Sequence, residues 1–131
     1  MSQENVDAFL TAVDAINRAD VEGFVGLATD DVVVSALRSA LAGDYRGHAG
    51  ARAFLADNEE TFEVFHASYE DVRELGDRVL ALGKIHVRVR AGQLETDLTS
   101  AGVAVFRDGK LARWTDYGDR NAALKAVGLE E

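Results

Sequence analysis

The stretch AGVAVFRDGKLARWTDYGD, residues 101–119, contains two apolar segments separated by an Asp-Gly pair. Such a pair between two apolar segments predicts a β-hairpin. Glycine-containing pairs divide the preceding sequence in the same way. The chain therefore predicts four successive strands, at residues 65–75, 79–90, 93–106 and 110–117.

The N-terminal segment has the periodicity of a helix. Val6, Phe9 and Val13 belong to a series of apolar residues at helical spacing, which predicts an amphipathic helix. Ser2 is a candidate N-cap, because a serine hydroxyl accepts hydrogen bonds from the first amides of a helix. Asp20 has the same property and predicts the start of a second, shorter helix.

The segment between these helices and the hairpins is mixed. Residues 32–34 predict a short strand, and residues 35–46 lack a clear period and predict a loop. A third helix is expected from near Gly47, with one stripe formed by Phe54, Leu55, Asn58 and Phe62. A last helix is expected to begin at Asp119 and to end at Gly128. Helices followed by antiparallel strands are typical of an α+β fold.

Composition narrows the class of protein. A chain of 131 residues with 47% apolar and 28% charged residues predicts one globular domain, 1–131. The net charge of −9 disfavours nucleic acids and anionic membranes as partners, because both repel an acidic surface. Cysteine is absent, which excludes disulfides and thiolate chemistry. Without a long apolar run or a signal-peptide profile, we expect a cytoplasmic protein.

Several motifs carry a resemblance. They are Asn17-Arg18-Ala19-Asp20-Val21-Glu22-Gly23, Tyr45-Arg46-Gly47-His48-Ala49-Gly50, Asp108-Gly109-Lys110-Leu111 and Trp114-Thr115-Asp116-Tyr117-Gly118-Asp119. Together they resemble the SnoaL-like family of the nuclear-transport-factor-like and ketosteroid-isomerase-like superfamily. The resemblance implies a cone-shaped, cystatin-like α+β barrel, in which a curved antiparallel sheet wraps around a long N-terminal helix and leaves a pocket at its open end. It also implies a homodimer formed through the sheet face. Because this fold hosts many chemistries and binding roles, the resemblance names no reaction.

The register of the first long hairpin follows from charge and apolar pairing. A two-residue Ala91-Gly92 loop places opposite charges face to face, and it pairs Arg88 with Glu95 and His86 with Asp97. The other face then pairs Val89 with Leu94, Val87 with Thr96, and Ile85 with Leu98. A three-residue loop would place leucines on the charged face, so we reject it.

The next hairpin is expected to have a three-residue loop, Arg107-Asp108-Gly109, with Gly109 in the left-handed conformation. This register pairs Ala104 with Ala112, Gly102 with Trp114, and Ser100 with Asp116. Trp114 would then lie over Gly102. A two-residue Asp108-Gly109 loop is the alternative, and it would turn Trp114 and Asp116 to the opposite face.

These registers predict the lining of a concave pocket. The lining is Gly83, Ile85, Val87, Leu98, Ser100, Gly102, Ala104, Trp114 and Asp116, closed by Phe24, Phe54 and Phe62, with Tyr45 at the rim. From this set we predict ligand-binding roles for Trp114, Ser100, Gly102, Ala104, Leu98, Ile85, Val87, Phe24, Phe62 and Tyr45. An apolar face with one carboxylate suits a small, largely apolar ligand.

Asp116 is the candidate catalytic residue. A carboxylate in apolar surroundings has a raised pKa, which suits a general acid or base. Its motif resembles that of limonene-type epoxide hydrolases, which implies this role for Asp116. Those enzymes also need an Arg-x-Asp pair, where this chain has Gly83 and Ile85. The structural alternative is that Asp116 bonds Ser100 or a helix amide, or that it points to solvent.

The sequence lacks the residues that ketosteroid isomerisation, zinc binding and phosphate binding would need. Ketosteroid isomerases need a Tyr, an Asp base and an acidic donor where this chain has Ala12, Ser35 and Gly102 or Ala101. His48 and His66 have no zinc-type spacing, and the glycines match no phosphate loop, so we predict no metal and no cofactor.

The outer face of the sheet carries a basic stripe, formed by Lys84, His86, Arg88 and Arg90. It is either a site for an anion or a partner, or a solvated face paired with Glu95 and Asp97, and we favour the second interpretation.

Three functions remain. The first is a pocket that binds a small apolar metabolite without catalysis. The second is a cofactor-independent enzyme of the cyclase, isomerase or epoxide-hydrolase type that uses Asp116. The third is a structural dimerisation domain whose pocket is filled by its own side chains. A single carboxylate without a partner favours the first.

Overall fold

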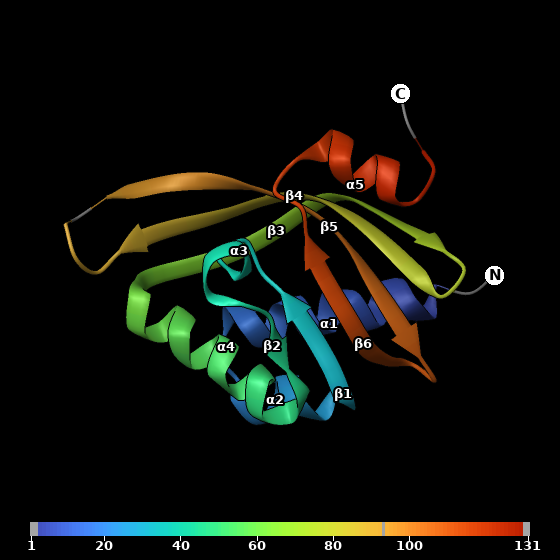
Figure 1. The fold of residues 1–131 in the computed structure, drawn as a ribbon, viewed down its shortest axis with the longest axis horizontal. Helices are drawn as coiled ribbons and strands as arrows, with labels where there is room; N and C mark the ends of the chain where they lie inside the picture. Colours follow the sequence, from blue (N-terminus) through green and yellow to red (C-terminus); the bar gives the residue numbers. More distant parts are fainter. Residues whose placement is uncertain (1–2, 93, 130–131) are drawn as a thin grey trace.

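A computed structural model describes residues 3–92 and 94–129. Figure 1 shows a strongly curved sheet with α1, α2 and α4 on its concave side and α5 on its convex side. The elements are α1 (Glu4–Asn17), α2 (Val21–Gly26), β1 (Ala28–Ser35), α3 (Ser39–Ala42), β2 (Tyr45–Arg46), α4 (Gly47–Thr61), β3 (Phe62–Leu75), β4 (Arg78–Val89), β5 (Glu95–Arg107), β6 (Lys110–Asp116) and α5 (Arg120–Ala126). Within the described residues, no helix is long and apolar enough to cross a membrane.

The helix starts follow local capping chemistry. The Asp20 side chain accepts a hydrogen bond from the Gly23 amide at the start of α2. The Asp119 side chain does the same for the Ala122 amide at the start of α5. Both predicted caps are therefore confirmed. The N-cap of α1 is Gln3, and Ser2 lies outside the described residues.

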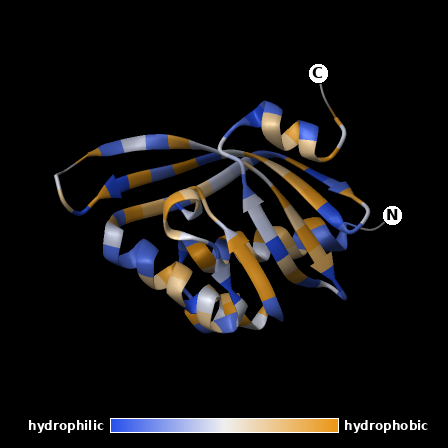
Figure 2. Ribbon diagram, viewed as in Figure 1, coloured by the Kyte–Doolittle hydropathy of each residue, from blue (hydrophilic) through white to orange (hydrophobic). Residues whose placement is uncertain are grey.

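The six strands form one mixed sheet in the order β2-β1-β6-β5-β4-β3. The expected all-antiparallel sheet is wrong in one place, because β1 runs parallel to β6, with Val34 opposite Trp114. A parallel pair requires a long crossover, and the chain between β1 and β6 supplies it. β1 is strongly hydrophobic over its second half (Figure 2), where Val32 and Val34 are buried.

Two expected boundaries are also corrected. The segment expected to be a loop contains the short helix α3 and the two-residue strand β2. Phe62 does not share the stripe of α4, because it is the first residue of β3 and its ring packs on Phe65 at 5.7 Å.

The β4–β5 hairpin has the expected register. Arg88 pairs with Glu95, His86 with Asp97, Val87 with Thr96, and Ile85 with Leu98. The Val89 amide also donates to the Leu94 carbonyl at 2.8 Å. Charge pairing on one face and apolar pairing on the other were therefore sufficient to determine this register.

The β5–β6 hairpin differs from the expectation. Arg107 pairs with Lys110, so the loop is the two-residue Asp108-Gly109 turn. Both turn residues have positive φ, 53° and 79°, as a type I′ turn requires. The expected three-residue loop is therefore wrong.

A β-bulge next to this turn returns Trp114 and Asp116 to the face of the sheet on which they were expected. Phe106 pairs with Leu111 and Val105 with Arg113, so β6 contains one extra residue, Ala112. Beyond the bulge, Ala104 pairs with Trp114 and Gly102 with Asp116. The expected pairs are wrong by two residues, but the period of two keeps Trp114 and Asp116 on the concave face.

Candidate functional site

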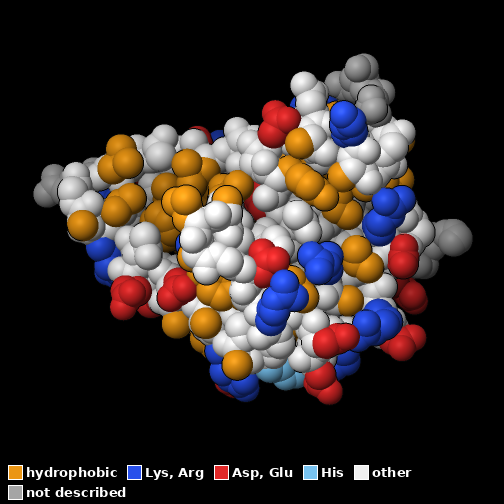
Figure 3. Space-filling view, in the orientation of Figure 1, with side chains coloured by type: hydrophobic (Ala, Val, Ile, Leu, Met, Phe, Trp, Pro, Cys, Tyr) orange, Lys and Arg blue, Asp and Glu red, His pale blue; other side chains and the backbone are white. Residues whose placement is uncertain are grey.

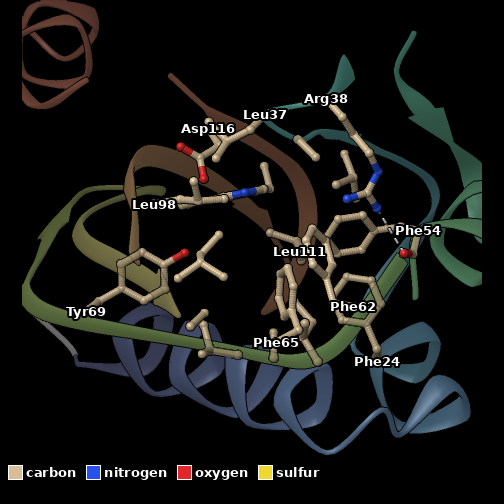
Figure 4. Close-up of a pocket in the computed structure, with 18 of the residues that line it drawn as sticks. Phe24, Leu37, Arg38, Phe54, Phe62, Phe65, Tyr69, Leu98, Leu111 and Asp116 are labelled. Atoms are coloured by element: carbon tan, nitrogen blue, oxygen red, sulfur yellow. Dashed lines mark hydrogen bonds between the residues drawn. The ribbon is translucent and has the colours of Figure 1, made fainter. Parts of the chain in front are cut away.

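A cavity of about 280 Å³ lies between the concave face of the sheet and the helices. Its walls are predominantly apolar, and among the lining residues only Arg38 and Asp116 are charged. Figure 4 shows Asp116 and Tyr69 on one side of the cavity and Arg38 beside Phe54 on the other. The lining consists of Phe9, Ala12, Val13, Ile16, Phe24, Val34, Ala36, Leu37, Arg38, Phe54, Thr61, Phe62, Phe65, Ala67, Tyr69, Ile85, Leu98, Leu111, Trp114 and Asp116.

Three aromatic rings form a rigid wall. The Phe9 centroid lies 5.3 Å from that of Tyr69 and 5.4 Å from that of Trp114, and Tyr69 meets Trp114 edge-on at 6.0 Å. These separations suit offset and edge-to-face packing. A Cβ atom at Gly102 would lie 2.7 Å from the Trp114 ring. The missing side chain at Gly102 therefore lets the indole lie flat against β5.

Asp116 is held by donors on its own side of the cavity. Its Oδ2 accepts from the Ser100 hydroxyl at 2.6 Å. Its Oδ1 accepts from the amides of Gly118 at 2.9 Å and Ala101 at 3.1 Å. The Tyr69 hydroxyl lies 2.7 Å from the Ser100 oxygen. Because Ser100 donates to Asp116, its oxygen is free to accept from Tyr69, which gives a chain from Tyr69 through Ser100 to Asp116.

Burial controls the protonation of this chain. Burial raises the pKa of the Asp116 carboxyl, against the opposing effect of the Ser100 hydroxyl and the two backbone amides. Burial also raises the pKa of the Tyr69 phenol, and the nearby Asp116 charge adds to this. Tyr69 therefore remains a neutral donor, and Asp116 is the acidic group of this hydrogen-bonded chain, with a pKa above its ordinary value.

Arg38 occupies the other side of the cavity. Its Nε donates to the Tyr45 hydroxyl at 2.7 Å, and its Nη2 donates to Asn58 Oδ1 at 2.7 Å and to the Phe54 carbonyl at 3.2 Å. The guanidinium carbon lies 5.2 Å from the Phe54 ring centroid. Tyr45 in turn donates to Asp57 at 2.6 Å. Helix α4 thus fixes the position of an arginine that comes from the segment between β1 and α3.

The predicted ligand-binding residues divide into two groups. Trp114, Leu98, Ile85, Phe24 and Phe62 lie on the cavity wall, together with the predicted catalytic residue Asp116 and with Phe54. Ser100, Gly102, Ala104, Val87 and Tyr45 do not lie on it. The binding and catalytic roles themselves stay predictions.

Packing explains the second group. Ser100 and Ala104 are fully buried behind the wall, and Gly102 lies beneath Trp114. Val87 packs among Phe62 and Phe65, and Tyr45 packs edge-on against Phe54 at 5.5 Å. Gly83, expected to face the pocket, instead lies against the backbone of Ser68 and Tyr69 where β3 bulges.

The sequence did not point to Arg38 or Tyr69. Arg38 lies in a segment without periodicity, and its partners on α4 are 16 and 20 residues away. One signal was present, because Arg38 is the single charged residue between Asp31 and Asp44 in an otherwise apolar or small-residue stretch.

The convex face has a different character. His86 lies between Asp97 and Glu95, with ring nitrogen to carboxylate oxygen distances of 2.7 Å each. Lys84 lies 3.6 Å from Asp97. The expected ladder of opposite charges is confirmed. Helix α5 covers the rest of this face, where Leu80, Leu82, Ala101 and Val103 are buried beneath Leu124.

The remaining histidines form no metal site. The ring of His48 lies 3.2 Å from the Ala28 carbonyl, and His66 is exposed on β3. Across residues 3–92 and 94–129, no cluster of three or more His, Asp or Glu side chains could hold a metal ion.

Comparison with known proteins identifies the family. The model of the SnoaL-like domain matches residues 6–114. The chain therefore belongs to the SnoaL-like family, with the nuclear-transport-factor-like and ketosteroid-isomerase-like fold. No curated protein matches the sequence significantly.

Solved structures show the same fold. An NTF2-like protein of unknown function from Burkholderia pseudomallei is 20% identical, with a TM-score of 0.78 over 98% of this chain and 99% of that one. TerC, co-crystallized with polyporic acid, is 26% identical, with a TM-score of 0.77 over 95% and 98%. A Mycobacterium tuberculosis protein in complex with estradiol-17beta-hemisuccinate is 15% identical, with a TM-score of 0.74 over 87% and 92%.

Proposed function

We propose that this protein binds a small, largely apolar metabolite in its cavity and does so without a cofactor. The observation that carries the proposal is a cavity of about 280 Å³ with predominantly apolar walls. Protein interiors are normally close-packed, with few voids larger than a water molecule. A space of this size is therefore better explained by an occupant than by imperfect packing, and it argues against a pocket filled by its own side chains.

The relatives support a binding role. TerC and the Mycobacterium tuberculosis protein were crystallised with organic ligands, polyporic acid and a steroid derivative. Those ligands suggest the size and ring content of the compounds to test here. The cytoplasm as location and a homodimer through the sheet face remain parts of this proposal. Because α5 covers the apolar part of the convex face, a second copy would meet the charged ladder around His86.

The site favours binding over catalysis. Both oxygens of Asp116 accept hydrogen bonds from the protein, which fixes the link between β5, β6 and the start of α5. Among the described residues, the cavity wall contains no second carboxylate and no histidine. A reaction that needs both an acid and a base would have to use Asp116 for both.

A thermal-shift screen tests the binding proposal. Neutral and acidic ring compounds, including terpenes, sterols and polyketide aromatics, should contain ligands that raise the melting temperature by mass action. Ala67→Phe would place a ring in the cavity and should abolish these shifts. Ser68→Phe adds the same ring to the exposed neighbouring position and should preserve them. Shifts that survive Ala67→Phe would contradict the proposal.

A second candidate function rests on the Tyr69–Ser100–Asp116 chain. This chain ends in a carboxyl group with a raised pKa on the cavity wall, so Asp116 could transfer a proton to or from a ligand. A stabilising compound should then be converted by the wild type but not by Asp116→Asn, as measured by mass spectrometry. Binding without conversion by either protein would leave the binding function alone.

A further inference from the structure

The cavity wall carries a positive charge, Arg38, that forms no direct ion pair with a carboxylate of the described residues. The acceptors around Arg38 are a tyrosine hydroxyl, a backbone carbonyl and an amide oxygen, all of which are neutral. Within residues 3–92 and 94–129, no carboxylate forms an ion pair with it. Asp57 is linked to Arg38 only through the Tyr45 hydroxyl. A guanidinium stays protonated in proteins, so the charge is permanent.

The guanidinium keeps free donors at the cavity wall. Nε and Nη2 are bound by the protein, but Nη1 has no partner among the described residues. Nη1 carries two N–H groups. Figure 4 shows the Arg38 side chain reaching toward the cavity, while a dashed line marks its bond on the other side. The rings of Tyr45 and Phe54, at 5.3 and 5.2 Å, hold the orientation of the guanidinium.

The surroundings of Arg38 contain a further unpaired donor. Asn58 is 6% exposed, and its Oδ1 accepts from Arg38. Its Nδ2 is buried and has no hydrogen-bond partner among the described residues. Donors therefore outnumber acceptors around the guanidinium, which favours an incoming group that only accepts.

The energetics favour a compensating anion. A charge at an apolar wall loses hydration, and this cost is offset only when the charge is paired. The whole chain has a net charge of −9, so its long-range field repels anions. Arg38 is consequently a local positive charge on the cavity wall of a chain whose overall charge repels anions.

We propose that the ligand is an apolar anion: a ring system carrying one carboxylate or similar oxyanion that pairs with Nη1 of Arg38. Its apolar body lies against Phe9, Trp114 and Leu98. Its far end faces Asp116. This inference rests on the proposed function, because it names the class of ligand for the same cavity.

Two fluorescent probes that differ in one group test it. The sulfonate 8-anilinonaphthalene-1-sulfonate and the neutral N-phenyl-1-naphthylamine share the same rings, and both brighten on entering apolar sites. The anion should bind the wild type more tightly. Arg38→Gln should lower the affinity for the anionic probe by about tenfold to hundredfold, as expected for a lost charge-assisted hydrogen bond. The affinity for the neutral probe should change by no more than about twofold.

Two further variants serve as controls. Arg46→Gln removes one positive charge from the exposed second residue of β2 and should change neither affinity. Arg38→Lys keeps the charge and should recover part of the anion affinity. If Arg38→Gln does not fold, the wild-type comparison decides the question.

Each contrary outcome has a distinct meaning. A neutral probe that binds the wild type as tightly as the anion, or loses as much affinity in Arg38→Gln, would overturn the anion proposal and leave the binding function intact. If neither probe bound the wild type, both the binding function and the anion proposal would be overturned.

Discussion

The convex and concave sides of the sheet use polar residues in opposite ways. On the convex face, His86 contacts two carboxylates, Asp97 and Glu95, and all three side chains are exposed to water. On the concave face, Asp116 and Arg38 lie far from each other in an apolar cavity, and each is fixed by neutral donors or acceptors. Exposed ion pairs contribute little to stability, whereas a charge in an apolar cavity is costly unless a partner or hydrogen bonds compensate it.

Apolar side chains also surround the opening of the cavity at the surface of the protein. Figure 3 shows hydrophobic side chains gathered between the β4–β5 hairpin and α3. Leu98, which lines the cavity, is 36% exposed there, so the apolar interior reaches the surface at this point. The concave face is therefore lined by apolar side chains as far as the surface, whereas the part of the convex face around His86 is polar and exposed.

The largest effect is expected at the glycine that permits the curvature of the concave face. A Cβ atom at Gly83 would lie 2.6 Å from Tyr69 Cα and would also meet the Ser68 carbonyl. Because these are backbone atoms, Gly83→Ala should lower the free energy of unfolding by about 1–3 kcal/mol, the range for overpacking. Urea unfolding measures this.

Gly26→Ala is the control for Gly83→Ala, since a Cβ atom at Gly26 in α2 would meet no other part of the chain within 4 Å. It should be neutral or stabilising. An unchanged unfolding midpoint in Gly83→Ala would contradict the tight approach of β3 to β4.

A smaller loss is expected when the buried hydroxyl chain is broken. Ser100 is fully buried and bridges Tyr69 and Asp116. Ser100→Ala leaves both partners without their hydrogen bond and should lower stability by about 1–2 kcal/mol. Thr99→Ala, on the exposed face of the same strand, should change stability much less. If Ser100→Ala and Thr99→Ala lowered stability equally, the hydrogen bonds of Ser100 to Tyr69 and Asp116 would make no specific contribution to stability.

Asp116 should make stability depend on pH. Its pKa is higher in the folded protein than the ordinary value of 3.8, so the folded state holds its proton more tightly. The contribution is complete below 3.8 and is lost as the pH rises through the folded pKa. The melting temperature of the wild type relative to Asp116→Asn should therefore decrease across this interval. A difference that grows with pH would show that the pKa is lowered instead.

The smallest effect is expected on the convex face. Hydrogen bonds to Asp97 and then to Glu95 raise the pKa of His86 above 6.5. Its stabilising contribution is complete below 6.5 and is lost as the pH rises through the folded pKa. His86→Gln should lower the melting temperature slightly at about pH 6 and not at about pH 9. A large decrease in melting temperature at both pH values would contradict this prediction, because it would mean that these exposed pairs contribute more to stability than such pairs usually do.

The contrast also explains what the sequence could predict. The β4–β5 register was predictable because Arg88, His86 and their partners form a charge pattern that only one register satisfies. The bulge at Ala112 was not predictable, since no residue type marks an extra residue beside a regular turn. The predicted face of Trp114 was therefore correct, although the predicted length of the turn was wrong.

The candidate site was predictable only in part. Residues on regular strands, such as Ile85 and Leu98, follow from alternation once the register is known. Arg38 and Tyr69 depend on tertiary packing, because the acceptors of Arg38 come from α4 and the partner of Tyr69 from β5. Gly102 and Gly83 were expected to line the pocket, but both lie in close contact with neighbouring strands, Gly102 beneath Trp114 as expected and Gly83 against the backbone of β3.

The central claim is that the concave cavity, and not the apolar cluster under α5, receives the ligand. Methyl NMR of the wild type, titrated with N-phenyl-1-naphthylamine, tests it most directly. We expect the methyl signals of Ile85, Leu98 and Val13 to shift, while those of Leu80, Leu82 and Val103 stay in place. Shifts confined to the second set, or spread equally over both, would contradict the account.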